Sequence, residues 1–228
     1  MTTDLPVGSV TLEMMRSHLS VPLLCDALDG IGMRHQSPSL SLLAMTAPAG
    51  GLPSMLIGYC KTTLWAEMAH VDPEPYALEL AAVDSCKRDD VIVCAANGSM
   101  RSGIWGELLS TAARNCGCAG VLVDGAVRDV SKMRSMGFNV YARGSNPLDS
   151  RDRQRVIDYD IDLELGGVRI APGDLIAADE DGVVVVPKRV VDQVTHTAWA
   201  KAHAENEVRA AIAGGMSATK AFQKYGVL

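Results

Sequence analysis

Short apolar runs alternate with segments of helical periodicity along much of this chain. The apolar runs are the length of buried strands and lie at residues 55–63, 91–95, 119–123 and 138–143. Apolar residues recur at three- and four-residue spacing, the pattern of amphipathic helices, at residues 10–19, 21–30, 75–86, 105–116 and 131–136. Strands that alternate with helices predict parallel pairing through right-handed crossovers.

The pattern changes after residue 156, where apolar and polar residues begin to alternate. Residues 157–165 are predicted as one half-exposed strand, and Gly166-Gly167 as a hairpin turn. Further short strands are predicted at residues 168–170, 175–178 and 183–186. Antiparallel strands are therefore mixed with the parallel units, which predicts an α/β domain with a mixed sheet. The pattern assigns no structure to residues 64–72.

A helical arm is predicted after this core. Residues 187–213 form either one long helix or two, and residues 201–209 are too polar to be buried in their own domain. We therefore expect an α/β core over residues 1–186, with helices at its N-terminus, and an arm over residues 187–228. Such an arm commonly docks on a neighbouring subunit.

The stretch from 97 to 130 contains the residues with the clearest chemical meaning. A loop with glycines at both ends, residues 98–103, allows the backbone to approach a ligand closely. Glu107 lies in the first turn of the helix that follows, where the free N–H groups of residues 106–109 favour an anion. Arg128 and Asp129 follow the next buried strand, in a turn expected at the same edge of the sheet.

Each of these residues also has an ordinary structural explanation. A glutamate in a first helical turn complements the helix dipole, and an Arg–Asp pair in a turn is commonly a solvated surface pair. Their combination with a glycine loop favours a site. The guanidinium of Arg128 suits a carboxylate or an enolate, while Glu107 and Asp129 supply the hard oxygen ligands that Mg²⁺ or Mn²⁺ prefers.

Two motifs in this stretch resemble the RraA-like family: WGELL at residues 105–109 and DGAVRDV at residues 124–130. The enzymatic members of that family are 4-hydroxy-4-methyl-2-oxoglutarate aldolases, which also decarboxylate oxaloacetate. The family pattern is an acid, twenty intervening residues, and then Arg-Asp. Glu107, Arg128 and Asp129 have this spacing, although the acid is Asp in many family aldolases. Family members that regulate a ribonuclease without catalysis lack an intact Arg-Asp pair.

The resemblance implies a swivelling β/β/α fold and a metal-dependent (class II) pyruvate aldolase with oxaloacetate decarboxylase activity. The substrate is then an oxo acid, whose carboxylate binds the N–H groups of Gly106, Glu107, Leu108 and Leu109 while Arg128 stabilises the enolate. Asp129 and Glu107 would hold the cation. The resemblance also implies a homotrimer or homohexamer, in which a glutamate of the arm completes the neighbouring metal site. Glu205 is the first choice for that role and Glu207 the second.

Composition and charge narrow the function classes further. The formal net charge of −6 argues against a nucleic-acid partner, and no apolar run is long enough to span a membrane. No secretory signal is visible, and none of the six cysteines has the C-x₂-C spacing of a zinc site, so a cytoplasmic protein with reduced thiols is expected. Two alternatives stay open: a non-catalytic regulator that binds a ribonuclease, and a related lyase acting on another oxo acid or a sugar acid.

Overall fold

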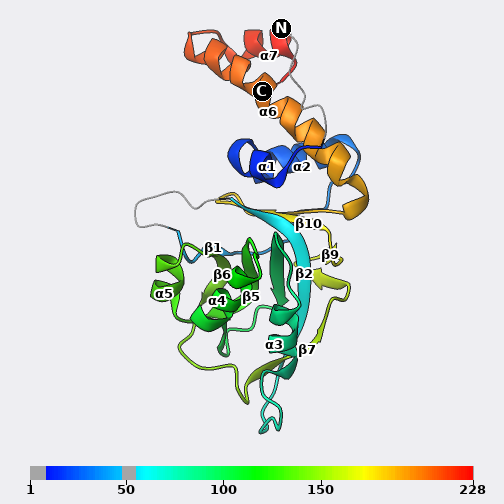
Figure 1. Ribbon diagram of the computed structural model, residues 1–228. Coiled ribbons are helices and arrows are strands. Elements are labelled where there is room, and N and C mark those ends of the chain that lie inside the picture. The colour runs from blue at the N-terminus through cyan, green and yellow to red at the C-terminus, as the bar shows by residue number, and fades with distance from the viewer. Residues whose placement is uncertain (1–8, 48–54, 228) are drawn as a thin grey trace.

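A computed structural model describes residues 9–47 and 55–227 of the chain (Figure 1). Its strands are β1 (Leu43–Ala44), β2 (Leu56–Glu67), β3 (Asp90–Ala95), β4 (Gly103–Trp105), β5 (Gly120–Val127), β6 (Asn139–Ser145), β7 (Gln154–Tyr159), β8 (Leu163–Leu165), β9 (Val168–Ile170), β10 (Leu175–Ala178) and β11 (Val183–Val186). Its helices are α1 (Leu12–His18), α2 (Val21–Gly30), α3 (Ala77–Asp84), α4 (Glu107–Asn115), α5 (Val130–Ser135), α6 (Val191–Ala213) and α7 (Ala218–Tyr225), with a 3₁₀ turn, η1, over Lys188–Val190.

One mixed sheet organises the core. Its strand order is β1-β6-β5-β3-β2-β10-β11, with β4 paired to β5 and β7 paired to β2. The central strands β6, β5, β3 and β2 are parallel to one another, whereas β1, β7, β10 and β11 are antiparallel to their neighbours. The prediction of a mixed α/β sheet is confirmed. The separate β8–β9 pair is the hairpin predicted at Gly166-Gly167.

Residues 64–72, which the pattern left unassigned, begin as a continuation of β2. The strand runs on to Glu67 because β7 pairs antiparallel with its second half, from Thr63 onward. The sequence predicted a strand that turns polar at Lys61 and ends at residue 63. Its side chain is buried, and its Nζ donates hydrogen bonds to Asp160 Oδ2 at 2.6 Å and Ser85 Oγ at 2.8 Å. A buried lysine with both partners in place is compatible with a central strand.

Two other predicted elements differ from the structure. The strand expected over residues 157–165 is split into β7 and β8, because Asp160 adopts a left-handed backbone conformation with φ of 56°. The helix expected from Trp105 begins at Glu107, because β4 occupies residues 103–105 beside β5. Trp105 is buried, and its Nε1 donates to Ser110 Oγ at 2.8 Å.

The sheet is covered on both faces, and β3 illustrates how its side chains are divided. Ile92 and Cys94 pack in a cluster with residues of α3, α4 and α5, whereas Val91 and Val93 pack in another with residues of β8, β9 and β10. This alternation is the period of two expected along a strand. A third cluster joins α1, α2 and the first half of α6 to β10 and β11.

Of the two alternatives for residues 187–213, the structure has the single long helix α6, preceded by η1, and the short helix α7 follows it. Val194, Ala198 and Trp199 of α6 are buried against α1 and α2, and the rest of the helix leads away from the sheet toward α7 (Figure 1). The division at residue 186 into core and arm stays a prediction. Among the described residues, no helix has both the length and the apolar character needed to cross a membrane.

Candidate active site

The predicted residues Arg128 and Asp129 lie at the carboxyl end of the parallel strand β5. The strand ends at Val127, and the Arg128 N–H donates to the carbonyl oxygen of Trp105 on β4 at 2.8 Å. Asp129 then takes a left-handed backbone conformation, with φ of 56°, as the residue before α5. The tight turn places both side chains at the edge of the sheet where ligands bind in parallel α/β folds.

Gly106 allows this turn to approach the N-terminus of α4. A Cβ atom at Gly106 would lie 2.8 Å from Asp129 Oδ2 and 3.2 Å from Arg128 Cγ. Only glycine therefore fits without a shift of the site. The Glu107 N–H lies 3.4 Å from Asp129 Oδ2, and the first N–H groups of a helix have no partner within it. The start of α4 and the Arg-Asp turn thus form one surface, in which the Asp129 carboxylate accepts from the first turn of the helix.

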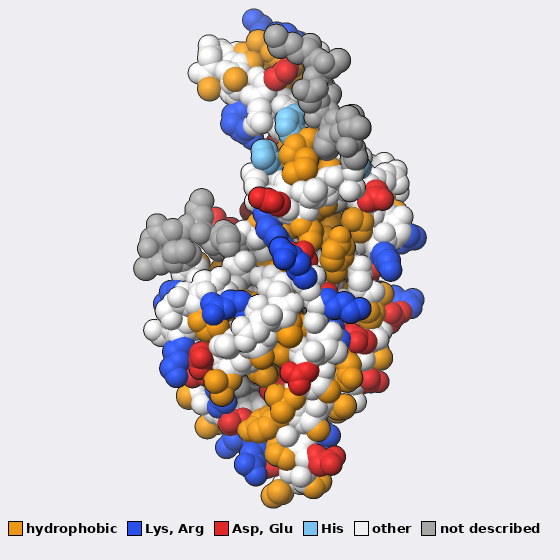
Figure 2. Space-filling model, in the orientation of Figure 1, with side chains coloured by type: hydrophobic (Ala, Val, Ile, Leu, Met, Phe, Trp, Pro, Cys, Tyr) orange, Lys and Arg blue, Asp and Glu red, His pale blue; other side chains and the backbone are white. Residues whose placement is uncertain are grey.

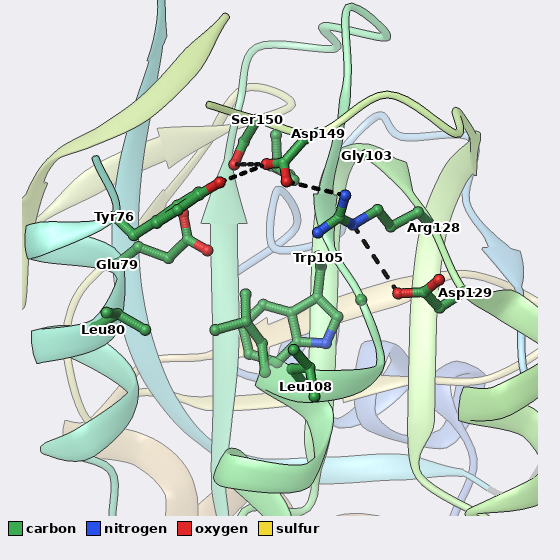
Figure 3. Close-up of a pocket in the computed structure, with 13 residues that line it drawn as sticks. Tyr76, Glu79, Leu80, Gly103, Trp105, Leu108, Arg128, Asp129, Asp149 and Ser150 are labelled. Atoms are coloured by element: carbon green, nitrogen blue, oxygen red, sulfur yellow. Dashed lines mark hydrogen bonds and ion pairs between the residues drawn. The ribbon is translucent and has the colours of Figure 1, made fainter. Parts of the chain in front are cut away.

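Asp149, which the sequence did not single out, holds the guanidinium of Arg128. Arg128 Nη1 lies 3.1 Å from Asp149 Oδ2, whereas Arg128 Nε is 3.9 Å from Asp129 Oδ2. The Tyr76 hydroxyl, from the turn before α3, donates to Asp149 Oδ1 at 3.0 Å (Figure 3). Burial opposes the charge on Asp149, but bonds from the Arg151 N–H and Tyr76, together with Arg128, lower its pKa. Asp149 therefore stays ionised and fixes the arginine.

Glu79, on α3, is a second residue that the sequence reading missed. Its side chain is buried beside the Arg128–Asp149 pair, and the residue is 7% exposed. Burial, followed by the charge of Asp149, raises the pKa of Glu79 from its ordinary value of 4.5 to about 8, although Arg128 opposes the shift. The sequence gives one signal of this site: Glu79 is the single acid in the otherwise apolar segment 78–83. At neutral pH this carboxyl group is protonated.

These side chains surround a cavity of about 320 Å³ between α3 and α4 (Figure 3). It is lined by Tyr76, Glu79, Leu80, Gly103, Ile104, Trp105, Gly106, Leu108, Leu109, Arg128, Asp129, Asp149 and Ser150. Of the predicted site residues, Gly106, Leu108, Leu109, Arg128 and Asp129 line it. The side chain of Glu107 does not, and its Oε1 lies 3.5 Å from Thr111 Oγ1.

Glu205 does not line this cavity, and it belongs to α6, which lies apart from α3 and α4 in a single chain (Figure 1). Its carboxylate is 3.9 Å from Lys201 Nζ and 3.8 Å from Arg209 Nη2, and it lines a different hollow with His18 and His203. Glu207 is exposed on the same helix. Completion of the site by either glutamate requires a second copy of the chain, and it stays a prediction.

The side chains of one chain fit a hard divalent cation only if water or substrate oxygens complete its coordination. Among residues 9–47 and 55–227, no group of three or more His, Cys, Asp or Glu side chains is placed to hold a metal. Asp129 faces the cavity with its carboxylate partly exposed. Mg²⁺ commonly binds through one or two carboxylates and completes its coordination with water and substrate oxygens. The cavity is compatible with that mode of binding.

Comparison with known proteins places the chain in a family. Residues 21–185 match the family model described as RraA-like: Aldolase/RraA. A protein of Halalkalibacterium halodurans, provisionally named a 4-hydroxy-4-methyl-2-oxoglutarate aldolase, is 35% identical over 219 residues, which are 95% of this chain and 96% of that one. Protein DlpA of Legionella pneumophila is 33% identical over 143 residues, but the match spans 63% of this chain and only 23% of DlpA.

Solved structures agree with this assignment. Streptomyces coelicolor RraAS2, described as an unusual member of the RNase ES inhibitor RraA protein family, superposes with a TM-score of 0.74. It is 27% identical, and the match covers 90% of this chain and 99% of that one. An uncharacterized protein from Pseudomonas syringae, 24% identical, has a TM-score of 0.75 over 94% of this chain and 98% of its own, and it supports the fold alone.

Proposed function

We propose that this chain, which belongs to the RraA-like family, is a divalent-metal-dependent lyase that cleaves 4-hydroxy-2-oxo acids and releases pyruvate. A family-level assignment as an aldolase or an RraA-type protein follows from the comparisons. The observation that carries the finer proposal is the Arg128 guanidinium, fixed by Asp149 beside Asp129 and the N-terminus of α4 within one cavity. 4-Hydroxy-4-methyl-2-oxoglutarate is an example of the substrate class.

The reaction frees an electron pair that the site must accept. The C4 hydroxyl loses its proton, the C3–C4 bond breaks to give a carbonyl product, and the electron pair delocalises into the C2 carbonyl as an enolate. A proton then adds at C3, and pyruvate is formed. Decarboxylation of oxaloacetate passes through the same enolate, so we propose it as a side activity. The negative charge that develops on the C2 oxygen of the enolate is the charge that the enzyme must stabilise.

Residues of this chain supply that stabilisation. Arg128 donates to the developing enolate oxygen, and one such donor in a dry site contributes about 3 kcal/mol. The backbone N–H groups of residues 106–109 bind the substrate carboxylate. Asp129 would hold the divalent cation, with Glu107 in its inner or outer coordination shell and Glu205 of a neighbouring subunit completing the site. When bound, Mg²⁺ or Mn²⁺ supplies a Lewis acid to the oxygens of the 2-oxo acid.

The remaining acids have positioning roles in this proposal. Asp149 and Tyr76 keep the guanidinium fork of Arg128 in one orientation. If its side chain turns from Thr111 toward the cavity, Glu107 orients a water molecule that accepts the proton from the C4 hydroxyl. We further propose, from the family resemblance, that the protein is a homotrimer or homohexamer in which a neighbouring copy completes the site.

Pyruvate release from a panel of 4-hydroxy-2-oxo acids tests the function directly. We expect turnover that disappears with EDTA and returns with Mg²⁺ or Mn²⁺, and we expect Arg128→Ala to lower kcat with little change in Tm. Full turnover in chelator would contradict the metal requirement, and an unchanged kcat in Arg128→Ala would remove that residue from the mechanism. Absence of pyruvate from every acid would favour the rival function, a regulator that binds a ribonuclease.

A further inference from the structure

Two cysteine thiols meet near the ends of α3 and α4. Cys86 lies two residues beyond the end of α3, Cys118 lies just before β5, and both thiols are free. Cys118 belongs to the buried cluster that residues of α3, α4 and α5 share, and Cys86 packs against this cluster. Hydrophobic side chains, a class that includes cysteine, gather over the lower part of the face seen in Figure 2, where Figure 1 places these helices. Neither thiol lines the cavity of the candidate active site.

The backbone fixes the two segments that carry these thiols. Two backbone hydrogen bonds, of 2.9 and 2.8 Å, join residues 89–90 to residues 117–119. Cys118 lies within the second segment, and its Sγ is 4.0 Å from the carbonyl oxygen of Lys87. Because Lys87 is the chain neighbour of Cys86, the two cysteines lie on adjoining segments that are already held together.

The Cys118 thiol is the strongest influence on the Cys86 thiol. A hydrogen bond with Cys118, followed by burial, raises the pKa of Cys86, whereas the ammonium group of Lys61 opposes the shift. Two thiols in hydrogen-bonding contact on fixed segments can be joined by a disulfide with little movement of the backbone. Cys116 is the rival partner, because its Sγ is 3.8 Å from the carbonyl oxygen of Val83 on α3.

We propose that Cys86 and Cys118 form a disulfide when the protein meets a peroxide, and that this bond cross-links the ends of the stretch between them. The Cys86 sulfur, the more exposed of the two, attacks hydrogen peroxide. The O–O bond breaks, one water leaves, and Cys86 becomes a sulfenic acid. The Cys118 sulfur then attacks the Cys86 sulfur, the S–S bond forms, and the sulfenic oxygen leaves as a second water. The two waters carry both thiol protons, and the peroxide is reduced.

The raised pKa of Cys86 determines how fast this modification proceeds. The thiolate is the nucleophile, and little of it is present at neutral pH, so the bond forms slowly and accumulates only under sustained oxidation. The bond closes a loop that contains β3, β4 and α4, and therefore the stretch that carries Gly106. Such a cross-link stabilises the folded protein mainly by constraining the unfolded chain. The pairing is independent of the proposed lyase activity.

Peptide mapping after oxidation tests the pairing. The reduced protein is treated with hydrogen peroxide, alkylated, and digested with trypsin without further reduction. Trypsin releases Cys86 in peptide 62–87, and it releases Cys116 and Cys118 together in peptide 115–128. In Cys116→Ser, Cys118 is the remaining thiol of the second peptide. We expect the two peptides of this variant to be joined after peroxide and to separate when dithiothreitol is added.

Cys118→Ala is the matched variant, in which Cys116 is the remaining thiol of that peptide. Joined peptides in Cys118→Ala but not in Cys116→Ser would identify Cys116 as the partner, and separate peptides in both variants would show that no bridge forms. Either result overturns the proposal.

Thermal unfolding gives a second measurement. We expect oxidation to raise the Tm of Cys116→Ser by about 5–10 °C, because the bond closes a loop of about thirty residues. Dithiothreitol should reverse the rise, and Cys118→Ala should show no rise. An unchanged Tm in Cys116→Ser whose peptides are joined would overturn the stabilising role of the bond.

Discussion

Arg128 Nη1 lies 3.1 Å from the carboxylate of Asp149, a residue on a different loop that also accepts a hydrogen bond from Tyr76. The pair is half-exposed, so its net contribution to stability is small. Its importance is geometric, because a guanidinium with a fixed plane presents its remaining donors in one direction. Three segments of the chain meet in this contact: the turn before α3, the turn after β5 and the loop before β7.

Asp149→Asn should reduce activity far more than stability. The amide still accepts a bond from Tyr76 but no longer pairs with the charge of Arg128, so the guanidinium loses its fixed orientation. We expect kcat/KM to fall about ten- to hundredfold, as for partners that orient a reacting group, with Tm nearly unchanged. Asp162→Asn is the control, since Asp162 pairs with Arg169 on an exposed surface. Equal losses in the two variants would contradict the role of Asp149.

Gly106→Ala tests the close approach of α4 to the Arg-Asp turn. The added methyl would lie 2.8 Å from Asp129 Oδ2, so the carboxylate or the helix must shift. We expect about a hundredfold loss of kcat/KM, because small displacements of reacting groups are costly. Gly30→Ala provides the comparison, since nothing lies within 4 Å of a Cβ there. Wild-type kinetics in Gly106→Ala would show that the turn and the helix do not act together.

Glu79→Gln should change how stability depends on pH. The pKa of Glu79 is about 8 in the folded protein and near 4.5 when the chain is unfolded. Between these values the unfolded chain has released the proton that the folded chain keeps, so this residue lowers the free energy of unfolding as pH rises. Below pH 4.5 both states are protonated, and the residue has no such effect.

The variant removes this titration. We therefore expect the stability of Glu79→Gln, relative to wild type, to rise between pH 4.5 and 8 and to level off above, with a total on the order of a few kcal/mol. Urea unfolding of both proteins at a series of pH values measures this difference in the free energy of unfolding. Parallel stability curves for the two proteins would contradict the raised pKa of Glu79.

A mixing experiment tests whether Glu205 serves a neighbouring subunit. Arg128→Ala and Glu205→Gln should each be nearly inactive, but each keeps the residue that the other lacks. Oligomers reassembled from equal amounts of both should regain about a quarter of the sites, because a shared site draws one residue from each copy. Glu207→Gln is the control and should stay active. Glu207 lies two residues further along α6. If Glu207→Gln is inactive instead, the second choice of ligand is correct.

Sequence patterns predicted the parts of this fold that depend on local periodicity. The helix over residues 21–30 and the strands at 175–178 and 183–186 have the predicted bounds, because their apolar residues are buried with regular spacing. The extension of β2 beyond Thr63 could not be predicted, because it depends on pairing with β7 about ninety residues later. The strand was predicted to turn polar at Lys61, because the buried partners of this lysine are not visible in the local pattern.

The same limit applies to the candidate site. Arg128, Asp129 and Gly106 belong to one contiguous stretch with glycines and a helix start, so their proximity could be predicted. Tyr76 and Asp149 are 73 residues apart, and neither carries a local signal of the hydrogen bond that joins them. Glu107 has the expected position at the start of α4, but its carboxylate turns toward Thr111. Residue spacing does not determine which rotamer a side chain adopts, so this orientation could not be predicted.

The length of β2 has a consequence for synthesis on the ribosome. This strand pairs with β3 soon after both have emerged, but its two ends wait for β7 and β10, which are made about a hundred residues later. Until then, a nascent chain exposes unpaired backbone on a strand rich in apolar side chains. Translation that stalls before residue 154 therefore leaves an edge open to other chains, and β7 and β10 close it only when they have been translated.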